Sequence, residues 1–196
     1  MPSVIANSVR ITDALARYDV VVAAQGVSKL VELDRWYHDE LPGAIAARRT
    51  PHVTSAELVR ITEWKMARGV WRAPNHVLVR SNPADAVVEA TTAALALVPH
   101  PTQPIALMAK SLKGVGPATA SAVAAAARPD LYSFFDELVA AQIPGLGTVA
   151  WTLGYYARYA AALREMATGL GGDWTPASLE RALWAKVGGK AGDVAR

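Results

Sequence analysis

The sequence predicts an all-α fold. Proline or a capping Ser, Thr or Asn precedes most apolar segments, and glycine follows many of them, which is typical of helix starts and ends. Hydrophobic residues make up 52% of the 196 positions, and alanine is abundant, so a packed helical core is favoured over disorder. Val20–Val22 is a candidate short strand, but no convincing partner strand accompanies it.

The chain is expected to form one compact unit with two parts, without a repeat or a low-complexity linker. Residues 1–53 are expected to be an N-terminal helical segment that packs on the core, with helices over 12–18 and 28–38. Residues 54–196 are expected to be the main helical domain.

The clearest helix start is at Thr54. Glu57 stands three residues later, and Val53 precedes it, which together form a capping box with a hydrophobic staple. The pattern predicts a helix over 55–68 that ends near Gly69.

Later helices are expected where proline or a capping side chain can open them. Asn82 is predicted to cap a helix that has Pro83 at its first position. The later helices are predicted over residues 82–97, 104–113, 117–128, 148–166 and 175–186.

Composition excludes several classes of site. The chain has no cysteine, so disulfides, zinc–thiolate sites and cysteine-ligated iron–sulfur clusters cannot form. The four histidines are scattered without metal-ligand spacing, and no P-loop, dinucleotide fingerprint or nucleophile elbow occurs, so we expect no metal and no cofactor. The start lacks signal-peptide features, and the apolar stretches are too short for a membrane span, which predicts a cytoplasmic protein without membrane contact.

Positive charge is concentrated in three stretches, although the net charge is only +3. Residues 60–80 hold five basic side chains against Glu63 alone, and 110–128 hold three without an acid. The tail, 181–196, holds four against Asp193. This bias favours a polyanion partner, although solvated helix faces give similar counts.

The most informative segment is the short turn expected between the helices over 104–113 and 117–128. Its sequence is Leu-Lys-Gly-Val-Gly-Pro, from Leu112 to Pro117. Both glycines, Gly114 and Gly116, can adopt positive φ, and the backbone amides can then face outward at the positive end of the next helix. Such a turn is suited to a phosphate oxygen.

In this interpretation Val115 is buried between the two helices and Lys113 adds charge beside the turn. The alternative is an ordinary helix–helix corner in which the glycines only allow the bend. The residues that we expect to contact a nucleic-acid backbone are Lys113, Gly114, Val115, Gly116, Ala118 and Thr119.

The turn resembles the hairpin of the helix-hairpin-helix (HhH-GPD) DNA glycosylase superfamily, the relatives of endonuclease III and the adenine glycosylases. The match covers Leu112 to about Val139. The resemblance implies a hairpin that grips the DNA backbone and a catalytic aspartate downstream, which is Asp136 here. It also implies DNA repair by a hydrolase, in which a carboxylate assists cleavage of the N-glycosidic bond of a flipped base.

Three positions depart from the family pattern. Ala118 stands where bifunctional members carry a Schiff-base lysine, which favours a monofunctional enzyme. Ala141 stands where an arginine often occurs, and Glu137 beside Asp136 is unusual. The cysteines of the iron–sulfur branch are absent. These departures leave a non-catalytic helix-hairpin-helix module as an alternative.

Asp136 also has a structural interpretation. Ser133 could cap a helix, and Asp136 would then occupy its third position, where an acidic side chain complements the helix dipole.

Aromatic and basic side chains elsewhere are candidates for a pocket. A tryptophan at 64 or 71 could stack on an extruded base, and Lys65 could hold a phosphate, although core packing is the simpler role for the tryptophans. The candidate pocket or phosphate contacts are Trp64, Lys65, Arg68, Trp71 and Tyr156, with Trp151 as a further one.

The sequence therefore predicts a DNA-binding protein that resembles a monofunctional DNA glycosylase. A non-catalytic DNA-binding module and a helical protein-interaction domain are the alternatives.

Overall fold

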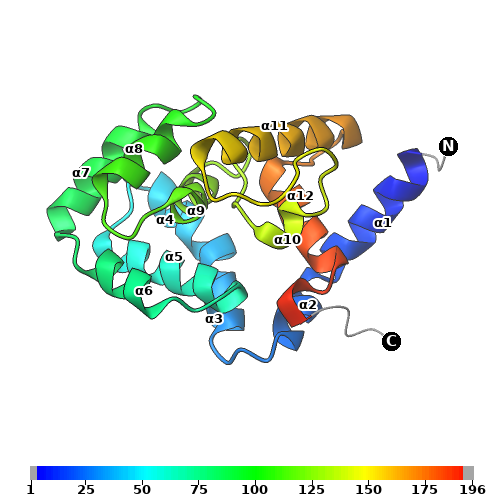
Figure 1. The fold of residues 1–196 in the computed structure, drawn as a ribbon, viewed down its shortest axis with the longest axis horizontal. Helices are drawn as coiled ribbons and strands as arrows, with labels where there is room; N and C mark the ends of the chain where they lie inside the picture. The colour runs from blue at the N-terminus through cyan, green and yellow to red at the C-terminus, as the bar shows by residue number, and fades with distance from the viewer. Residues whose placement is uncertain (1–3, 192–196) are drawn as a thin grey trace.

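The structure, a computed structural model, describes residues 4–191, with side chains from Arg10 onward. Every regular element in this range is helical, which confirms the all-α prediction, and Val20–Val22 belongs to a helix (Figure 1). The elements are α1 (Val4–Ala16), α2 (Tyr18–Ala24), α3 (Leu30–Arg35), the π-helix η1 (Trp36–Glu40), α4 (Leu41–Ala46), α5 (Ser55–Arg68), α6 (Ala73–Arg80), α7 (Ala84–Leu95), α8 (Gln103–Ser111), α9 (Pro117–Ala127), α10 (Glu137–Ala140), α11 (Leu153–Leu170), α12 (Pro176–Lys186) and the 3₁₀-helix η2 (Gly189–Ala191).

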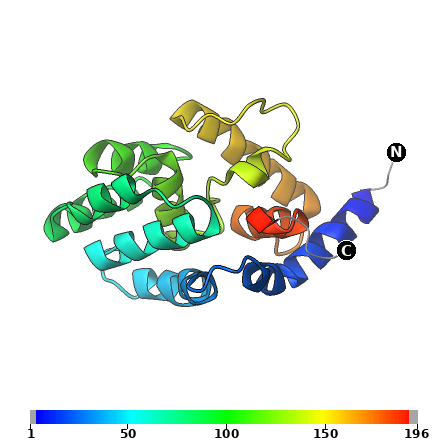
Figure 2. The same cartoon turned by 60° about the horizontal axis from the view of Figure 1, so that its bottom comes forward.

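The helices pack around one continuous hydrophobic core. Helices α3 to α9 lie towards one end of the molecule, whereas α10, α11 and α12 lie towards the other with α1 and α2 (Figures 1 and 2). Helix α5 packs against α3, α6 and α9, and α1 packs along α12. The N-terminal helices therefore contact both ends of the fold.

Helix α5 forms as its capping signals predict. Thr54 Oγ1 accepts from the backbone N–H of Glu57 at 3.2 Å, and Glu57 Oε2 accepts from the backbone N–H of Thr54 at 2.7 Å. Val53 is fully buried beside this cap, and Gly69 ends the helix. This helix carries Lys65 and Arg68 towards the centre of the molecule.

The predicted cap at Asn82 is wrong. Helix α7 begins after Pro83 and has no side-chain cap. The Asn82 amide instead holds the backbone of Lys113, with Nδ2 donating to the carbonyl at 2.9 Å and Oδ1 accepting from the N–H at 2.8 Å. The residue that we expected to start one helix thus anchors a distant turn.

Helix α11 begins five residues later than the predicted start at Thr148. Gly145 and Gly147 have φ values of +80° and +72°, which are not helical, so the chain turns before the helix begins. Thr152 caps the helix by accepting a hydrogen bond from the Tyr155 N–H. With 18 residues α11 is the longest of the described helices, yet no helix in residues 4–191 has the length and apolar character to cross a membrane.

Candidate functional site

The turn predicted between two helices lies between α8 and α9. We call Leu112–Gly116 the first turn. Gly114 has φ +72°, as expected, but Gly116 has φ −97° and ψ −176°, so the prediction of positive φ is wrong for Gly116. Val115 is 4% exposed and packs in the core, as predicted.

The first turn is fastened to α6. Asn75 Nδ2 donates to the Gly114 carbonyl at 2.9 Å, and Asn82 holds both backbone groups of Lys113. A Cβ atom on Gly114 would lie 2.9 Å from the Asn75 carbonyl oxygen and 2.9 Å from Leu78 Cβ. Glycine is therefore required here both by the backbone angle and by the close approach of α6.

Gly116 is a glycine for which neither reason applies. Its backbone is extended, it is exposed, and an added Cβ would meet no atom within 4 Å. It is the N-cap of α9, and no side chain caps the first N–H groups of that helix. The open backbone leaves room for a ligand to approach the positive end of the α9 dipole.

A cleft of about 320 Å³ opens beside this point. The end of α5, the start of α9, the segment before α10 and the residue Trp151 contribute to its walls. The cleft therefore brings together Gly116 and Asp136, which the sequence linked only through the family resemblance. Thr119, which is 1% exposed, also lines it, and its Oγ1 has no hydrogen-bond partner among the described residues.

Asp136 is 8% exposed and lines the cleft. Its Oδ1 accepts from the N–H of Leu138 at 2.8 Å and of Val139 at 3.3 Å, so Asp136 itself caps α10. The expected cap, Ser133, is buried, and its Oγ has no partner within residues 4–191, so that part of the prediction is wrong. Asp136 Oδ2 lies 3.6 Å from Nε of Arg68.

Arg68 is a fully buried cation. Its guanidinium forms an ion pair with Glu180 and stacks 4.5 Å from the ring centroid of Trp184. Burial raises the pKa of Glu180 to about 8, although Arg68 opposes that shift. Because Arg68 is held by Glu180 and Asp136, it is a structural part of the cleft wall and not a cation that can turn outward to a phosphate.

The predicted aromatic contacts divide between the core and the cleft. Trp64 is fully buried and stacks on Tyr37, with 3.7 Å between the ring centroids. Its Nε1 donates a hydrogen bond to Asp34 Oδ1. Tyr156 is also fully buried, and neither ring lines the cleft. Core packing, the simpler of the two roles considered for the tryptophans, accounts for Trp64.

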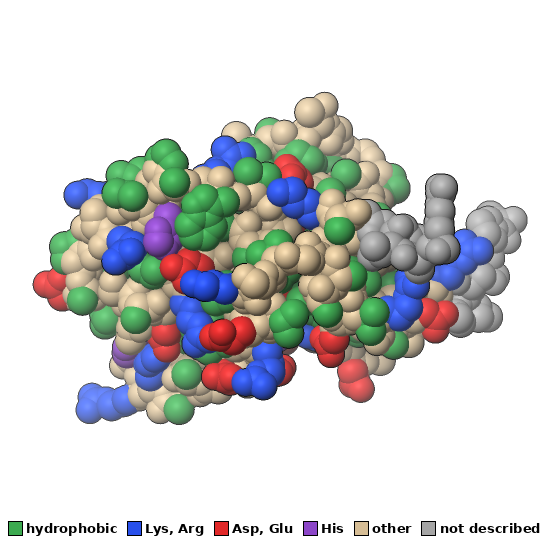
Figure 3. Space-filling view, turned by 90° about the horizontal axis from the view of Figure 1, so that it is seen from below, with side chains coloured by type: hydrophobic (Ala, Val, Ile, Leu, Met, Phe, Trp, Pro, Cys, Tyr) green, Lys and Arg blue, Asp and Glu red, His purple; other side chains and the backbone are tan. Residues whose placement is uncertain are grey.

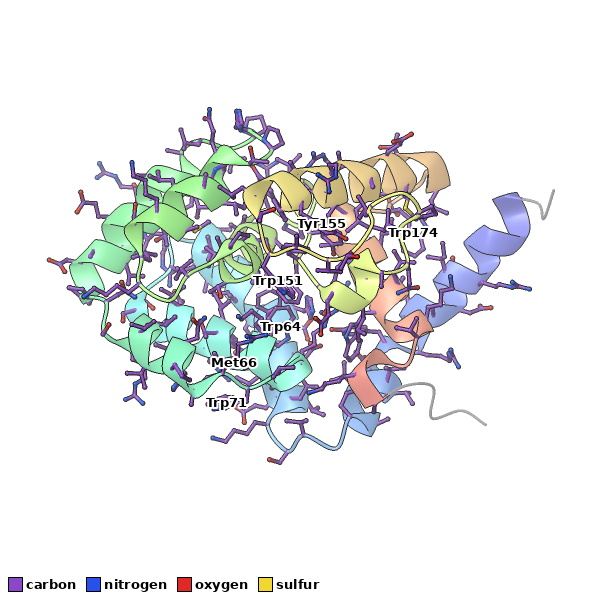
Figure 4. All side chains as sticks on the ribbon, in the orientation of Figure 1. Trp64, Met66, Trp71, Trp151, Tyr155 and Trp174 are labelled. Atoms are coloured by element: carbon purple, nitrogen blue, oxygen red, sulfur yellow. The ribbon has the colours of Figure 1, made fainter. Side chains whose placement is uncertain are left out.

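Two tryptophans are exposed on different parts of the surface. Trp71 is 55% exposed, packs near His76 and does not line the cleft. Trp151 is 45% exposed and lines the cleft, and its ring centroid lies 4.8 Å from that of Phe135. Figure 4 shows Trp71 and Trp151 at separate places in the molecule.

Three further cations border the cleft: Lys65, Arg72 and Lys190. Burial, and next the nearby charge of Arg72, lower the pKa of Lys65 to about 8. Lys190 Nζ donates to the carbonyl of Gly69 at 2.7 Å. The face seen from below in Figure 3 shows basic side chains interspersed with acidic ones. This face is therefore not uniformly positive, and the cations at the cleft are a local group.

Sequence reasoning missed some of these residues. Asn75 and Lys190 line the cleft only because tertiary packing brings them there, whereas Phe135 directly precedes Asp136 in the sequence. The only sequence signal for Lys190 was the basic bias of the tail.

The cleft thus combines an uncapped helix start, cations, an exposed aromatic side chain and two adjacent carboxylates, Asp136 and Glu137. Within residues 4–191 no group of three or more His, Asp or Glu side chains is placed to hold a metal ion. Comparisons with protein-family models, with curated proteins and with solved structures find no match for this chain.

Proposed function

We propose that the protein binds DNA through the first turn and hydrolyses the N-glycosidic bond of a nucleotide extruded into the adjoining cleft. The observation that carries this proposal is the shared cleft: the start of α9 and the Asp136 carboxylate line the same cavity. A backbone-binding element and a carboxylate are the two parts that such a reaction needs.

The first turn supplies the backbone contact. The N–H groups at the start of α9 have no side-chain cap, and a phosphate oxygen can take the place of that cap. Lys113 is exposed within the first turn, and Arg72 and Lys190 line the cleft, so an anion reaching α9 meets additional positive charge.

The cleft supplies the place for the base. Its volume lies within the usual range for small-molecule sites, and Trp151 presents an exposed ring on which a base can stack. Loss of the base develops positive charge on the sugar, which the Asp136 carboxylate stabilises while it orients the attacking water. Arg68 and the two N–H groups of α10 hold that carboxylate in place.

A second function is favoured by a specific observation: Asp136 caps α10. Two hydrogen bonds to Oδ1 account for an aspartate at this position without any catalysis. In that case the protein is a non-catalytic DNA-binding module that uses the same first turn.

Gly116→Ala tests DNA binding without disturbing the fold, because the added Cβ meets no atom and the backbone is extended. We expect the free energy of unfolding to stay within about 0.5 kcal/mol of the wild type, whereas duplex affinity falls about tenfold. Fluorescence anisotropy at two salt concentrations measures both the affinity and its salt dependence. Wild-type protein that binds no DNA, single- or double-stranded, would exclude both functions.

Asp136→Asn separates the two functions. The asparagine side chain keeps a carbonyl oxygen that can cap α10, but it lacks the negative charge. We expect base release from a panel of duplexes with damaged bases to fall at least about 100-fold, with DNA affinity changed less than about twofold. Wild-type protein that binds DNA but releases no base from any substrate would establish the non-catalytic module.

A further inference from the structure

The ion pair of Arg68 and Glu180 connects two cavities. Arg68 lines the cleft, whereas Glu180 lines a smaller cavity of about 140 Å³, which we call the second cavity. Residues of η1, α9 and α12 contribute to its walls. Its volume is below the range of about 300–1,000 Å³ that is usual for drug-sized ligands, so it matches a ligand of only a few heavy atoms.

Arg181 is a cation of the second cavity that has no counter-ion. It is half-buried in α12 and lines the cavity, and its guanidinium carbon lies 5.5 Å from the ring centroid of Tyr18. No described residue forms an ion pair with it, and its buried Nε has no hydrogen-bond partner among the described residues. A partly buried guanidinium without an anion is a binding point for an oxyanion.

The acidic side chains near Arg181 are already engaged with other groups. Glu180 forms an ion pair with Arg68. Asp34 Oδ1 accepts hydrogen bonds from the Tyr18 hydroxyl and from Trp64 Nε1, each at 2.8 Å. Within residues 4–191, therefore, no carboxylate of the chain takes the place of an anion bound to Arg181.

The rest of the second cavity determines the class of anion. His38 lines it, and burial, followed by the positive charge of Arg181, lowers the pKa of His38 well below its ordinary value, although Asp34 Oδ1 lies 3.8 Å from its Nε2. The imidazole is therefore neutral near pH 7, and Arg181 supplies one positive charge, which matches a monoanion better than a dianion. Phe134 and Pro42 add apolar wall for a short carbon chain.

We propose that the second cavity binds a small monocarboxylate of about two to four carbon atoms, with its carboxylate on the Arg181 guanidinium and its carbon chain against the apolar wall. A planar carboxylate matches the fork of the guanidinium and can accept two parallel N–H bonds from it. This site uses neither the first turn nor Asp136, so it does not rest on the proposed function.

The test is an NMR titration of ¹⁵N-labelled wild-type protein with sodium propionate at constant ionic strength. The Arg181 Nε–H group is observable because its burial slows exchange with water. We expect saturable shifts of this signal and of the backbone amides of His38 and Ser178, with a Kd of about 1 mM. Propionamide, which has the same shape without the charge, should cause no saturable shift, and phosphate should bind at least about tenfold more weakly.

The variant Arg181→Gln removes the charge, and we expect propionate to bind it at least about tenfold more weakly. Lys186→Gln is the matched control, because it removes one positive charge from the same helix at an exposed position that lines neither cavity. Its propionate affinity should match the wild type. Thermal unfolding shows whether each variant folds, and the shifts mapped on the wild type test the site without any variant.

Absence of a saturable shift in the wild type would overturn the proposal, as would equal binding of propionamide. Equal or tighter binding of phosphate would overturn the assignment to a monocarboxylate. Shifts confined to the start of α9 would also overturn it, because the anion would then occupy the cleft. None of these outcomes affects the proposed function, which the Gly116→Ala and Asp136→Asn experiments test separately.

Discussion

Two turns of this molecule share one local pattern but differ in their surroundings. The first turn, Leu112–Gly116, and a second turn, Ile143–Gly147, each have buried apolar residues at the first and fourth positions and an exposed second residue. Each has a positive-φ glycine at the third position, with φ +72° at Gly114 and +80° at Gly145. Both end on an exposed glycine.

The two turns differ in their tertiary contacts and in their distance from the next helix. The first turn is held against α6 by two asparagines, and α9 begins at once after Gly116. A Cβ on Gly145 would meet no atom within 4 Å, and five residues separate Gly147 from α11. The same local sequence pattern therefore sets a similar bend in both places, whereas tertiary contacts and the adjoining helix make only the first turn a rigid, uncapped helix start.

Alanine at the third position of each turn should give the largest contrast. Gly114→Ala adds both left-handed strain and a clash with the backbone of α6, and we expect it to cost about 3 kcal/mol of unfolding free energy. Gly145→Ala adds the strain alone and should cost about 1 kcal/mol. Urea unfolding measures both, and equal losses would contradict the role given to α6.

Asn82→Ala should have the next largest effect. It removes two hydrogen bonds to Lys113 and one each to the Val79 and Leu78 carbonyls, and we expect a loss of about 2 kcal/mol. The neighbouring Ser81→Ala is the matched control, because the exposed Ser81 hydroxyl donates only to the Leu78 carbonyl, and it should cost less than about 0.5 kcal/mol. If the two variants unfold alike, Asn82 does not anchor the first turn.

Trp151, four residues after the second turn, tests what the segment between that turn and α11 contributes to the cleft. Because its ring is 45% exposed, Trp151→Ala should lower stability by less than about 1 kcal/mol. Loss of base stacking should weaken binding of a duplex with an extruded base about tenfold, with less effect on an intact duplex. Trp71→Ala, which alters an exposed tryptophan outside the cleft, should leave both affinities unchanged.

The smallest effect is expected from charge at the second position of each turn. Lys113→Gln should weaken DNA binding a few-fold and lower the slope of log affinity against log salt by about 1. Pro144→Lys places a lysine at the same position of the second turn and should leave the slope unchanged. An increased slope for Pro144→Lys would mean that both turns face the DNA backbone.

Local signals in the sequence predicted a large part of the fold. The capping box at Thr54, the proline at the start of α9 and the Thr175–Pro176 start of α12 each act within one helical turn, and each helix forms where expected. Helix α6 has Pro74 in its first turn, but Arg72 precedes it without a side-chain cap, and we did not predict this helix.

The candidate site was predictable only where it depends on local pattern. The first turn was found from its local sequence, and Asp136 from the hairpin-to-aspartate spacing that the family resemblance implies. The role of Asn82 could not be predicted in this way. Its amide forms hydrogen bonds with Lys113, 31 positions away, and does not cap the adjacent helix α7. Trp64 and Trp151 could not be distinguished for the same reason: only tertiary packing decides which ring is buried and which lines the cleft.

The buried pair of Arg68 and Glu180 has a consequence for how the protein acquires its cleft. The two side chains are 112 positions apart in the sequence, and Asp136 stands between those positions. Closing so long a loop is entropically costly and comes late in folding. A nascent chain without α12 leaves the Arg68 charge without its Glu180 counter-ion, so we expect the cleft to take shape only after α12 has left the ribosome.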